Sequence, residues 1–424
     1  MAALALRVVD YLENTRHRVL LLFAASLLIS SVFRLAMPDS RKTDFDPDYA
    51  PQVASLLAGT GFVSADGGPL YRYPPVFPLL LAGSYRIADV LSVNRGSIIF
   101  LASALLVAAS SVIIFAIARS FFTAAAAFLS AVVFASHPHV LYLLLMPMSE
   151  TPFMVLFFGS VFFLLKALSG KEQAHQLHYA IGCGVLLGLA MLTRPIALFL
   201  PGVFAISMIL WGHPKPRAKF VFCLLFVSTV SLVISPWEVF LYKKRHEVVL
   251  LSSGGVPGLR DGLSFNNKTV RQKLELPKKV EQLSNEAWVR DRSFATSRDI
   301  KQFLLEKLRQ KPTAVAELFA LKAVRAWFGT DSQDPRLELI NKVLLIVYGP
   351  VVGLGLFSYW RDRKGELALP KTIVLLVCYF WFMTILVLSI ARYMVPAVGL
   401  LLIFAAYPIE RSARRFRATL AAPL

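Results

Sequence analysis

The chain runs from an apolar segment at residues 18–37, RVLLLFAASLLISSVFRLAM, into the acidic stretch Thr43-Asp44-Phe45-Asp46-Pro47-Asp48-Tyr49. The apolar segment has about the 20 residues that an α-helix needs to cross a bilayer. The carboxylates that follow it then lie at the membrane surface, where ionisable groups are costly unless they are paired or functional. This stretch predicts a membrane protein with polar chemistry at one face of the bilayer.

The composition of the whole chain is that of a helical membrane protein. Of its 424 residues, 56% are hydrophobic and 17% are charged, whereas soluble domains carry about 25% charged residues. The net charge of +19 does not indicate nucleic-acid binding, because basic residues in membrane proteins set topology and contact anionic lipid. The three cysteines lie inside apolar runs and form no metal-binding or disulfide pattern.

About ten segments are apolar enough and long enough to be membrane-spanning helices. The segment 74–92 is also apolar, but Pro74, Pro75, Pro78 and Arg86 interrupt it. We expect this segment to lie along the membrane surface. The predicted spans are residues 18–37, 95–118, 121–143, 151–168, 178–193, 196–212, 217–242, 339–359, 371–389 and 393–409.

Charge decides the orientation of these spans. If 74–92 does not cross the membrane, every short basic loop falls on one side, which the positive-inside rule makes the cytoplasm. Both termini then lie in the cytoplasm, and the acidic stretch lies outside. The basic loops contain Arg119; Lys166 and Lys171; Lys215, Arg217 and Lys219; Arg361, Arg363, Lys364 and Lys371; and Arg411, Arg414, Arg415 and Arg417.

The spans divide the chain into three parts. Residues 1–242 form an N-terminal transmembrane module, whose first outer loop at 38–94 holds the acidic stretch. Residues 243–338 form a large extracytoplasmic loop, and residues 339–424 form C-terminal transmembrane helices and a basic cytoplasmic tail. The large loop is polar, with helical patterns around Ile300–Leu308 and Ala314–Trp327.

Ionisable residues collect at the outer ends of the predicted helices. A structural interpretation exists for each of them. An arginine in an interhelical turn can extend to the lipid headgroups, Glu150 can favour a helix start, and Asp44 or Asp46 can cap an interfacial helix that begins near Asp48. The candidate residues are Asp44, Asp46, Asp48, Arg72, Tyr73, Glu150, Arg194 and Arg392.

The joint pattern favours a functional interpretation. Acids and arginines from distant parts of the chain fall at one membrane face. A carboxylate there can act as a general base, and an arginine can bind phosphate oxygens through two hydrogen bonds. A base beside a phosphate clamp at lipid level predicts transfer chemistry on a lipid-linked phosphate.

These residues resemble motifs of the GT-C superfamily of polyprenyl-phosphate-dependent glycosyltransferases, in the branch of protein O-mannosyltransferases and the lipid A aminoarabinose transferase. Asp44-Phe45-Asp46-Pro47-Asp48 is similar to the acidic first outer loop of the family, and Ser149-Glu150 occupies the place of its second acidic residue. The other matching motifs are Arg72-Tyr73-Pro74-Pro75-Val76-Phe77-Pro78, Thr193-Arg194-Pro195, Ser235-Pro236-Trp237 with Ser252-Ser253-Gly254-Gly255, and Arg392-Tyr393.

The resemblance implies a fold and a mechanism. The fold is an all-α bundle with interfacial helices in the first outer loop and a large helical second outer loop. One aspartate acts as the base in an inverting displacement, with Asp44 preferred and Asp46 and Asp48 as rivals. Glu150 positions the acceptor or the sugar. The donor phosphate is bound by Arg72, Tyr73, Arg194 and Arg392, with His246 as a weaker candidate in a loop at 243–253 that closes over the site.

The resemblance also implies partners and a location. The donor is a polyprenyl-phosphate hexose or pentose, the acceptor is a lipid, a glycan or a protein, and nucleic acid is not a partner. The enzyme is a multi-pass protein of the plasma membrane, with its active site on the extracytoplasmic side of the cell envelope. No resident cofactor is expected, and most relatives work without a metal, although three carboxylates can bind a divalent cation through oxygen.

Two other functions remain open at this stage. A transporter or flippase for a lipid-linked or anionic substrate is the main alternative, although charges at the membrane midplane and an internal repeat, which favour transport, are not seen. A structural or assembly role is the other, in which the acidic stretch is dispensable.

Overall fold

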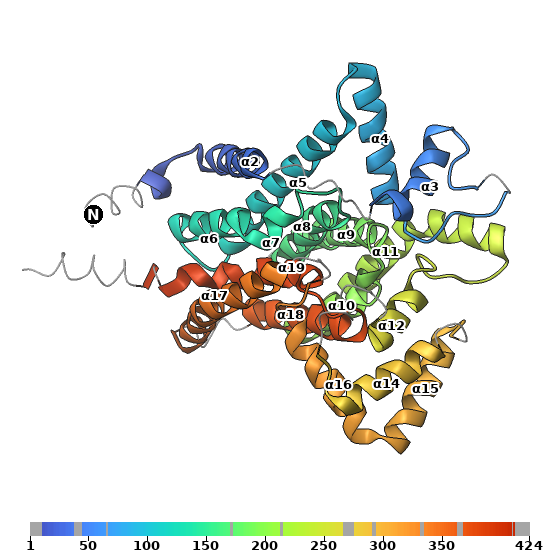
Figure 1. Cartoon of the computed structure of the whole chain (residues 1–424). Helices are drawn as coiled ribbons and strands as arrows, with labels where there is room; N and C mark the ends of the chain where they lie inside the picture. The colour runs from blue at the N-terminus through green and yellow to red at the C-terminus, as the bar shows by residue number, and fades with distance from the viewer. Residues whose placement is uncertain are drawn as a thin grey trace, which may run out of the picture. The chain divides into compact units, whose positions relative to one another are not determined.

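The computed structural model describes residues 11–37, 45–64, 67–169, 173–212, 215–265, 275–290, 294–330, 335–362, 368–408 and 410–411. Over these ranges the chain is helical (Figure 1), and the only β pairing is an isolated bridge between Val63 and Pro69. The predicted all-α class is confirmed. The chain divides into two compact units, which we call unit 1 (Met1–Leu251, Val351–Val374 and Gly399–Leu424) and unit 2 (Ser252–Pro350 and Leu375–Val398).

Among the described residues, five helices are long and apolar enough to cross a membrane: α2 (Arg18–Ala36), α5 (Arg95–Ala118), α8 (Glu150–Ser169), α11 (Pro216–Arg245) and α17 (Pro335–Asp362) from Arg336 onward. The chain is therefore a multi-pass membrane protein. A helix pairs its own backbone N–H and C=O groups, for which lipid offers no hydrogen-bonding partner. Shorter apolar segments follow the other predicted spans, and the count of ten crossings stays a prediction. They are α6 (Ala124–Ser136), residues Gln176–Met191 of α9 (Gln173–Met191), Pro195–Trp211, which contains α10 (Leu200–Trp211), residues Pro370–Leu386 of α18 (Ala368–Leu386), and Ala391–Ala406, which contains η3 (Ala391–Met394), α19 (Val395–Leu402) and η4 (Ile403–Ala406).

The centre of unit 1 is built from α5, α8, α9 and α11, with α9 packed against both α8 and α11. Gly184 and Gly188 lie four residues apart on α9. A Cβ added at these glycines would lie 2.8 Å from the Cβ atoms of Thr229 and Val233 on α11. Small residues at this spacing let two membrane helices approach closely. The α9–α11 contact therefore depends on both glycines.

Two carboxylates fix the start of α6. The Glu13 carboxylate accepts a hydrogen bond from the backbone N–H of Ala125 at 2.9 Å, and the Glu410 carboxylate accepts one from that of Thr123 at 3.1 Å. Negative groups are favourable at a helix N-terminus. The predicted span at 121–143 is interrupted at His137, after which the short helix α7 (Pro138–Tyr142) begins, because Pro138 has no N–H with which to continue α6.

The first outer loop forms two helices, α3 (Phe45–Leu57) and α4 (Val76–Leu91), which pack against each other. Their shared core contains Val53, Phe77 and Leu81. The helix that was expected to start near Asp48 begins at Phe45. Helix α4 has 16 residues, fewer than the roughly 20 that a crossing needs. The position of 74–92 along the membrane surface stays a prediction.

Unit 2 contains most of the predicted large loop. It forms α12 (Gly255–Ser264), α14 (Lys278–Val289), α15 (Ser297–Gln310) and α16 (Pro312–Arg325). The last two helices match the expected patterns at 300–308 and 314–327. Their apolar faces share one core, whose buried residues are Leu263, Phe265, Val280, Leu283, Ala287, Phe294, Ile300, Phe303, Ala314, Val315 and Leu318.

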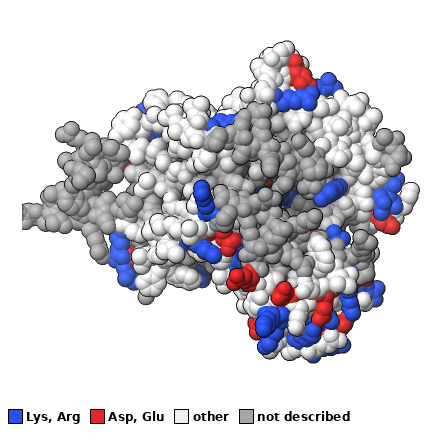
Figure 2. Space-filling view, in the orientation of Figure 1, with Lys and Arg blue, Asp and Glu red and all other residues white. Residues whose placement is uncertain are grey.

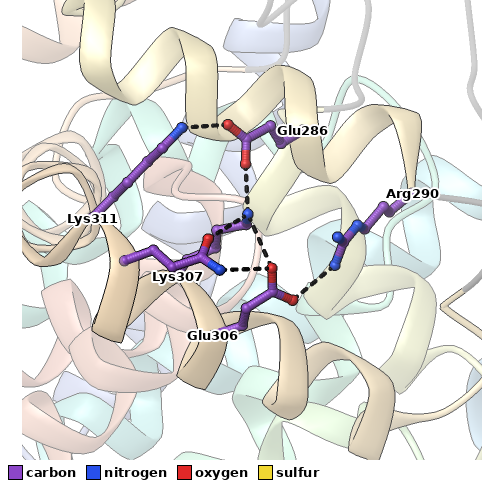
Figure 3. A network of polar contacts seen from close by, with 6 residues as sticks. Glu286, Arg290, Glu306, Lys307 and Lys311 are labelled. Atoms are coloured by element: carbon purple, nitrogen blue, oxygen red, sulfur yellow. Dashed lines mark hydrogen bonds and ion pairs between the residues drawn. The ribbon is translucent and has the colours of Figure 1, made fainter.

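The outward faces of these helices are charged. Figure 2 shows Lys, Arg, Asp and Glu side chains gathered over α14–α16. The Lys307 ammonium lies 2.8 Å from the Glu286 carboxylate and 3.3 Å from that of Glu306, which also pairs with Arg290 at 3.0 Å (Figure 3). Hydrogen bonds from Lys307 and Lys311 lower the pKa of Glu286. A network of this kind joins α14 to α15 more firmly than isolated surface pairs do.

Candidate active site

Helix α3 carries two of the three predicted aspartates. Asp46 and Asp48 lie in its first turn or just beyond, so Asp46 is inside the helix and not an N-cap in front of it. Their side chains, and Asp44 as a whole, lie outside the described residues. The first described side chain of the helix belongs to Tyr49, directly after Asp48.

Tyr49 connects α3 to the proline-rich element that follows it in the loop. The Tyr49 ring lies 4.2 Å from the Tyr73 ring, centroid to centroid, and meets the Phe77 ring edge-on at 4.9 Å. The exposed Arg72 guanidinium lies 5.5 Å from the centre of the Tyr73 ring. This is a cation–π contact, which favours a cation over the face of an aromatic ring. Arg72 and Tyr73 thus lie beside the acidic end of α3.

Glu150 and Arg194 form an ion pair, with an Arg194 Nη1 to Glu150 Oε1 distance of 2.6 Å and side chains that are only 4% and 14% exposed, Glu150 being the more buried. Glu150 begins α8, and Arg194 precedes the single turn η1 (Pro195–Ala197). The Arg194 guanidinium also lies 6.0 Å from the Phe153 ring. Each charge therefore has a partner, and a charge that is shielded from water is costly without one.

Two contacts bring the ion pair to the first outer loop. The Tyr49 hydroxyl donates to Ser149 Oγ at 3.4 Å, and the N–H of Val76 donates to the carbonyl of Leu192 at 3.0 Å. Residues that are about a hundred positions apart thus meet in unit 1. The predicted site residues that this neighbourhood contains are Arg72, Tyr73, Glu150 and Arg194.

Two other predicted residues, Arg392 and His246, belong to other elements. Arg392 belongs to unit 2, in the turn η3, where the N–H of Ala391 donates to the carbonyl of Gly329 at 2.8 Å. His246 is the exposed residue after α11 and adopts a left-handed conformation, with φ 56°. The loop after it returns to α11, because the Leu251 backbone bonds to both Trp237 Nε1 and the Glu238 carboxylate, at 2.7 and 2.8 Å.

Sequence reasoning missed two residues of this neighbourhood, Tyr49 and Gln52. Gln52 is 2% exposed, and its amide donates to the carbonyls of Leu70 and Tyr73. Tyr49, Gln52 and Val53 have the spacing of one helix face, which was the available signal. Among the described side chains no group of three His, Cys, Asp or Glu residues is arranged to hold a metal. The side chains of Asp44, Asp46 and Asp48 lie outside the described residues.

The comparisons with known proteins agree with this reading of the fold. The family described as dolichyl-phosphate-mannose-protein mannosyltransferase matches residues 72–240, a range that includes Arg72, Tyr73, Glu150 and Arg194. Comparison with curated protein sequences gives no match.

The similar solved structures include oligosaccharyltransferases and an ArnT. The oligosaccharyltransferase of Archaeoglobus fulgidus tethered with an acceptor peptide has a TM-score of 0.57 and 11% identity, over 96% of this chain and 51% of that one. The same organism's AglB with an inhibitory peptide and a dolichol-phosphate has a TM-score of 0.56 and 12% identity, over 97% and 53%. ArnT from Cupriavidus metallidurans bound to undecaprenyl phosphate has a TM-score of 0.46 and 15% identity, over 94% and 78%.

The chain therefore has the GT-C fold. It spans about half the length of the oligosaccharyltransferase chains that it matches.

Proposed function

We propose that this GT-C chain is a membrane glycosyltransferase that moves a sugar from a polyprenyl-phosphate donor to an acceptor outside the plasma membrane. The observation that carries the proposal is the convergence of the acidic end of α3, the Arg72–Tyr73 element and the Glu150–Arg194 pair. This convergence supports a site in which a base from the 44–48 stretch, a phosphate-binding Arg72 and the shielded ion pair act together. The matched family and the lipid-phosphate complexes of similar structures support the donor class.

The reaction is a single displacement at the anomeric carbon of the donor sugar. A hydroxyl or amine of the acceptor forms the new bond while the bond to the phosphate oxygen breaks. An aspartate of the 44–48 stretch, Asp44 first, takes the acceptor proton, and the polyprenyl phosphate leaves with the bonding electron pair. Attack on the face opposite the leaving group inverts the configuration. Removal of such a base slows a reaction by roughly 100- to 10,000-fold.

The arginines stabilise the charge that grows on the leaving phosphate. Arg72 is exposed beside α3 and is the first candidate. Arg194 has five N–H donors in its guanidinium, so it can bind Glu150 and a phosphate together. Glu150 then fixes the direction of the Arg194 side chain and positions the acceptor or the sugar through it. We assign Arg392 the same phosphate-binding role, as the sequence pattern predicts. Loss of one such contact costs roughly 2.7–4 kcal/mol of transition-state stabilisation.

The test compares glycans, glycolipids and glycoproteins of the cell envelope, by mass spectrometry, in cells with and without this chain. We expect a sugar to be missing from one acceptor when the chain is absent. The missing group identifies donor and acceptor together and separates a hexosyl- from a pentosyltransferase. Unchanged glycans with a lipid-linked sugar retained on one side of the membrane would instead indicate a transporter or flippase.

Single aspartate variants then locate the base. Each variant is expressed in cells that lack the chain, and we expect Asp44→Asn not to restore the missing sugar. If only Asp46→Asn or only Asp48→Asn fails to restore it, that residue is the base. Asp89→Asn is the matched control, because Asp89 lies in the same loop but forms a surface ion pair with Arg95 at 2.9 Å. Full restoration by all three variants of the 44–48 stretch rules out an aspartate base there.

A further inference from the structure

The side chain of Gln52 holds the segment that carries Arg72. Its Nε2 atom donates to the carbonyl oxygen of Leu70 at 3.1 Å and to that of Tyr73 at 3.0 Å. The two carbonyls flank Arg72 in the chain. One amide group, with two N–H donors, thus spans the short stretch of backbone from which the Arg72 side chain projects.

The position of Gln52 makes these two hydrogen bonds consequential. Gln52 is 2% exposed, so the amide that makes these bonds is shielded from water. Both hydrogen bonds are partly buried, and a shielded polar group that loses its partner carries a desolvation penalty. The segment around Arg72 has no helix or strand of its own, since α4 begins only at Val76. Its backbone is therefore placed by contacts such as these.

The same face of α3 makes two further contacts with this region. The ring of Tyr49, three residues before Gln52, packs against the Tyr73 ring at 4.2 Å, with the two planes tilted by 32°. Val53, the next residue, is buried against Phe77 in the core that α3 shares with α4. Gln52 is the polar member of this face. It is the one of the three that bonds directly to the backbone on both sides of Arg72.

We propose that Gln52 is a positioning residue for the donor phosphate. It holds residues 70–73 on α3, so that the Arg72 guanidinium stays above the Tyr73 ring and next to the helix that carries Asp46 and Asp48. The Arg72 segment is thereby held on the helix that follows Asp44 in the chain. This inference rests on the proposed function, because it assumes that Arg72 binds a phosphate group.

The test measures binding of undecaprenyl phosphate and of undecaprenol to the full chain in lipid nanodiscs. The two probes share the polyprenyl tail and differ only in the phosphate. Gln52→Met keeps the length of the side chain and removes both donors. We expect it to weaken binding of the phosphate about fivefold, the effect of losing about one net hydrogen bond's worth of stabilisation, and to leave undecaprenol binding unchanged.

A double variant separates positioning from general destabilisation. If Gln52 acts through Arg72, Gln52→Met has no further effect on phosphate binding when it is added to Arg72→Ala, because coupled residues are not additive. Ser84→Ala is the control. It removes another buried polar group of the same loop, whose hydroxyl bonds only to its own helix, at Leu80, at 2.8 Å, and we expect it to change neither probe.

The outcomes distinguish the two proposals. If Arg72→Ala leaves the preference for the phosphate unchanged, the phosphate site of the proposed function is wrong. If Arg72→Ala removes that preference, three results for Gln52→Met would show that the positioning role is wrong. These are unchanged phosphate binding, a loss that adds to that of Arg72→Ala, and an equal loss of undecaprenyl phosphate and undecaprenol binding. Should Gln52→Met fail to fold, Gln52→Glu, which keeps the shape and cannot donate when ionised, is judged by the same criteria.

Discussion

The Glu150–Arg194 ion pair is the most shielded pair of opposite charges in the candidate site, with a 2.6 Å contact between side chains that are 4% and 14% exposed. A pair in such a position costs desolvation energy and repays it only while both partners are present. The sequence indicated only that Glu150 and Arg194 are charged residues at the ends of predicted helices. What each charge faces became clear only from the folded chain.

Removal of one partner should therefore destabilise the protein more than removal of both. We expect Glu150→Gln or Arg194→Gln alone to lower the free energy of unfolding by about 3 kcal/mol, because the remaining charge is left unpaired. The double variant should lose no more than either single variant. Denaturant unfolding of the purified protein in detergent measures this. Additive losses would show that the two side chains stabilise the fold independently.

Lys322 is a second buried charge, this one on α16 of unit 2. Its side chain is fully buried and donates to the carbonyl of Gly262 at 2.7 Å. Burial lowers the pKa of Lys322 to about 7, because the charged form is poorly solvated there. A large fraction of the Lys322 side chains is therefore neutral near physiological pH.

This shift gives a pH dependence with a definite sign. Between pH 7 and 10.5 the unfolded chain keeps the Lys322 proton that the folded chain has released, so stability should rise with pH over this window. Lys322→Met should remove the rise and increase stability at neutral pH by on the order of 3 kcal/mol. Unfolding curves across the window test this, with exposed Lys301→Met as the control. Parallel pH curves for wild type and Lys322→Met would contradict it.

At the scale of elements, close backbone contacts in unit 2 hold the turn that precedes Arg392. A Cβ added at Gly262 on α12 would lie 2.7 Å from the carbonyl oxygen of Leu386, and one at Gly329 would lie 2.6 Å from that of Ser389. These neighbours are backbone atoms, which cannot move aside as a flexible side chain does. The helices of the large loop therefore set the position of the Arg392 turn.

Gly262→Ala and Gly258→Ala form a matched pair on α12. Both gain helix propensity, by up to about 1 kcal/mol. At Gly258 the new Cβ would lie 3.7 Å from a Val387 methyl, an ordinary contact, so we expect no loss of stability. At Gly262 we expect a loss of about 1–3 kcal/mol from overpacking. Thermal unfolding of the two variants distinguishes the cases, and equal melting temperatures would contradict the close approach.

At the scale of the whole molecule, α11 connects the two sides of the membrane. Its 30 residues extend over about 45 Å, more than the hydrocarbon thickness of about 30 Å. Its C-terminal end lies at the first outer loop, where Trp237 meets Phe62 at 5.1 Å and the Arg245 guanidinium lies 5.4 Å from the Tyr71 ring. The predicted orientation puts this end outside the cell.

Cysteine labelling tests that orientation on one helix. In a variant without Cys183, Cys223 and Cys378, we introduce Lys244→Cys or Arg217→Cys, at exposed positions near opposite ends of α11. We expect a membrane-impermeant maleimide to label position 244 in intact cells and position 217 only after permeabilisation. The reverse result would place the candidate site in the cytoplasm and exclude an extracytoplasmic acceptor.

The sequence by itself determined the all-α membrane class, the places of the helices and the residues at which charge meets the bilayer. Hydropathy and helix length are properties of short stretches, and the cost of a charge near lipid depends on the residue itself. For this reason α5 begins and ends at the predicted residues 95 and 118, and α15 and α16 lie where their apolar periodicity indicated.

Only the tertiary structure decided which of those residues meet. The pairing of Glu150 with Arg194, the ring contact of Tyr49 with Tyr73 and the two hydrogen bonds of Gln52 depend on how each helix is rotated about its axis and where its neighbours pack. Tyr49 and Gln52 looked like ordinary residues of a helix face, because their partners are distant in the chain or belong to the backbone. Contacts of that kind are set by packing across the whole unit, and a local pattern does not contain them.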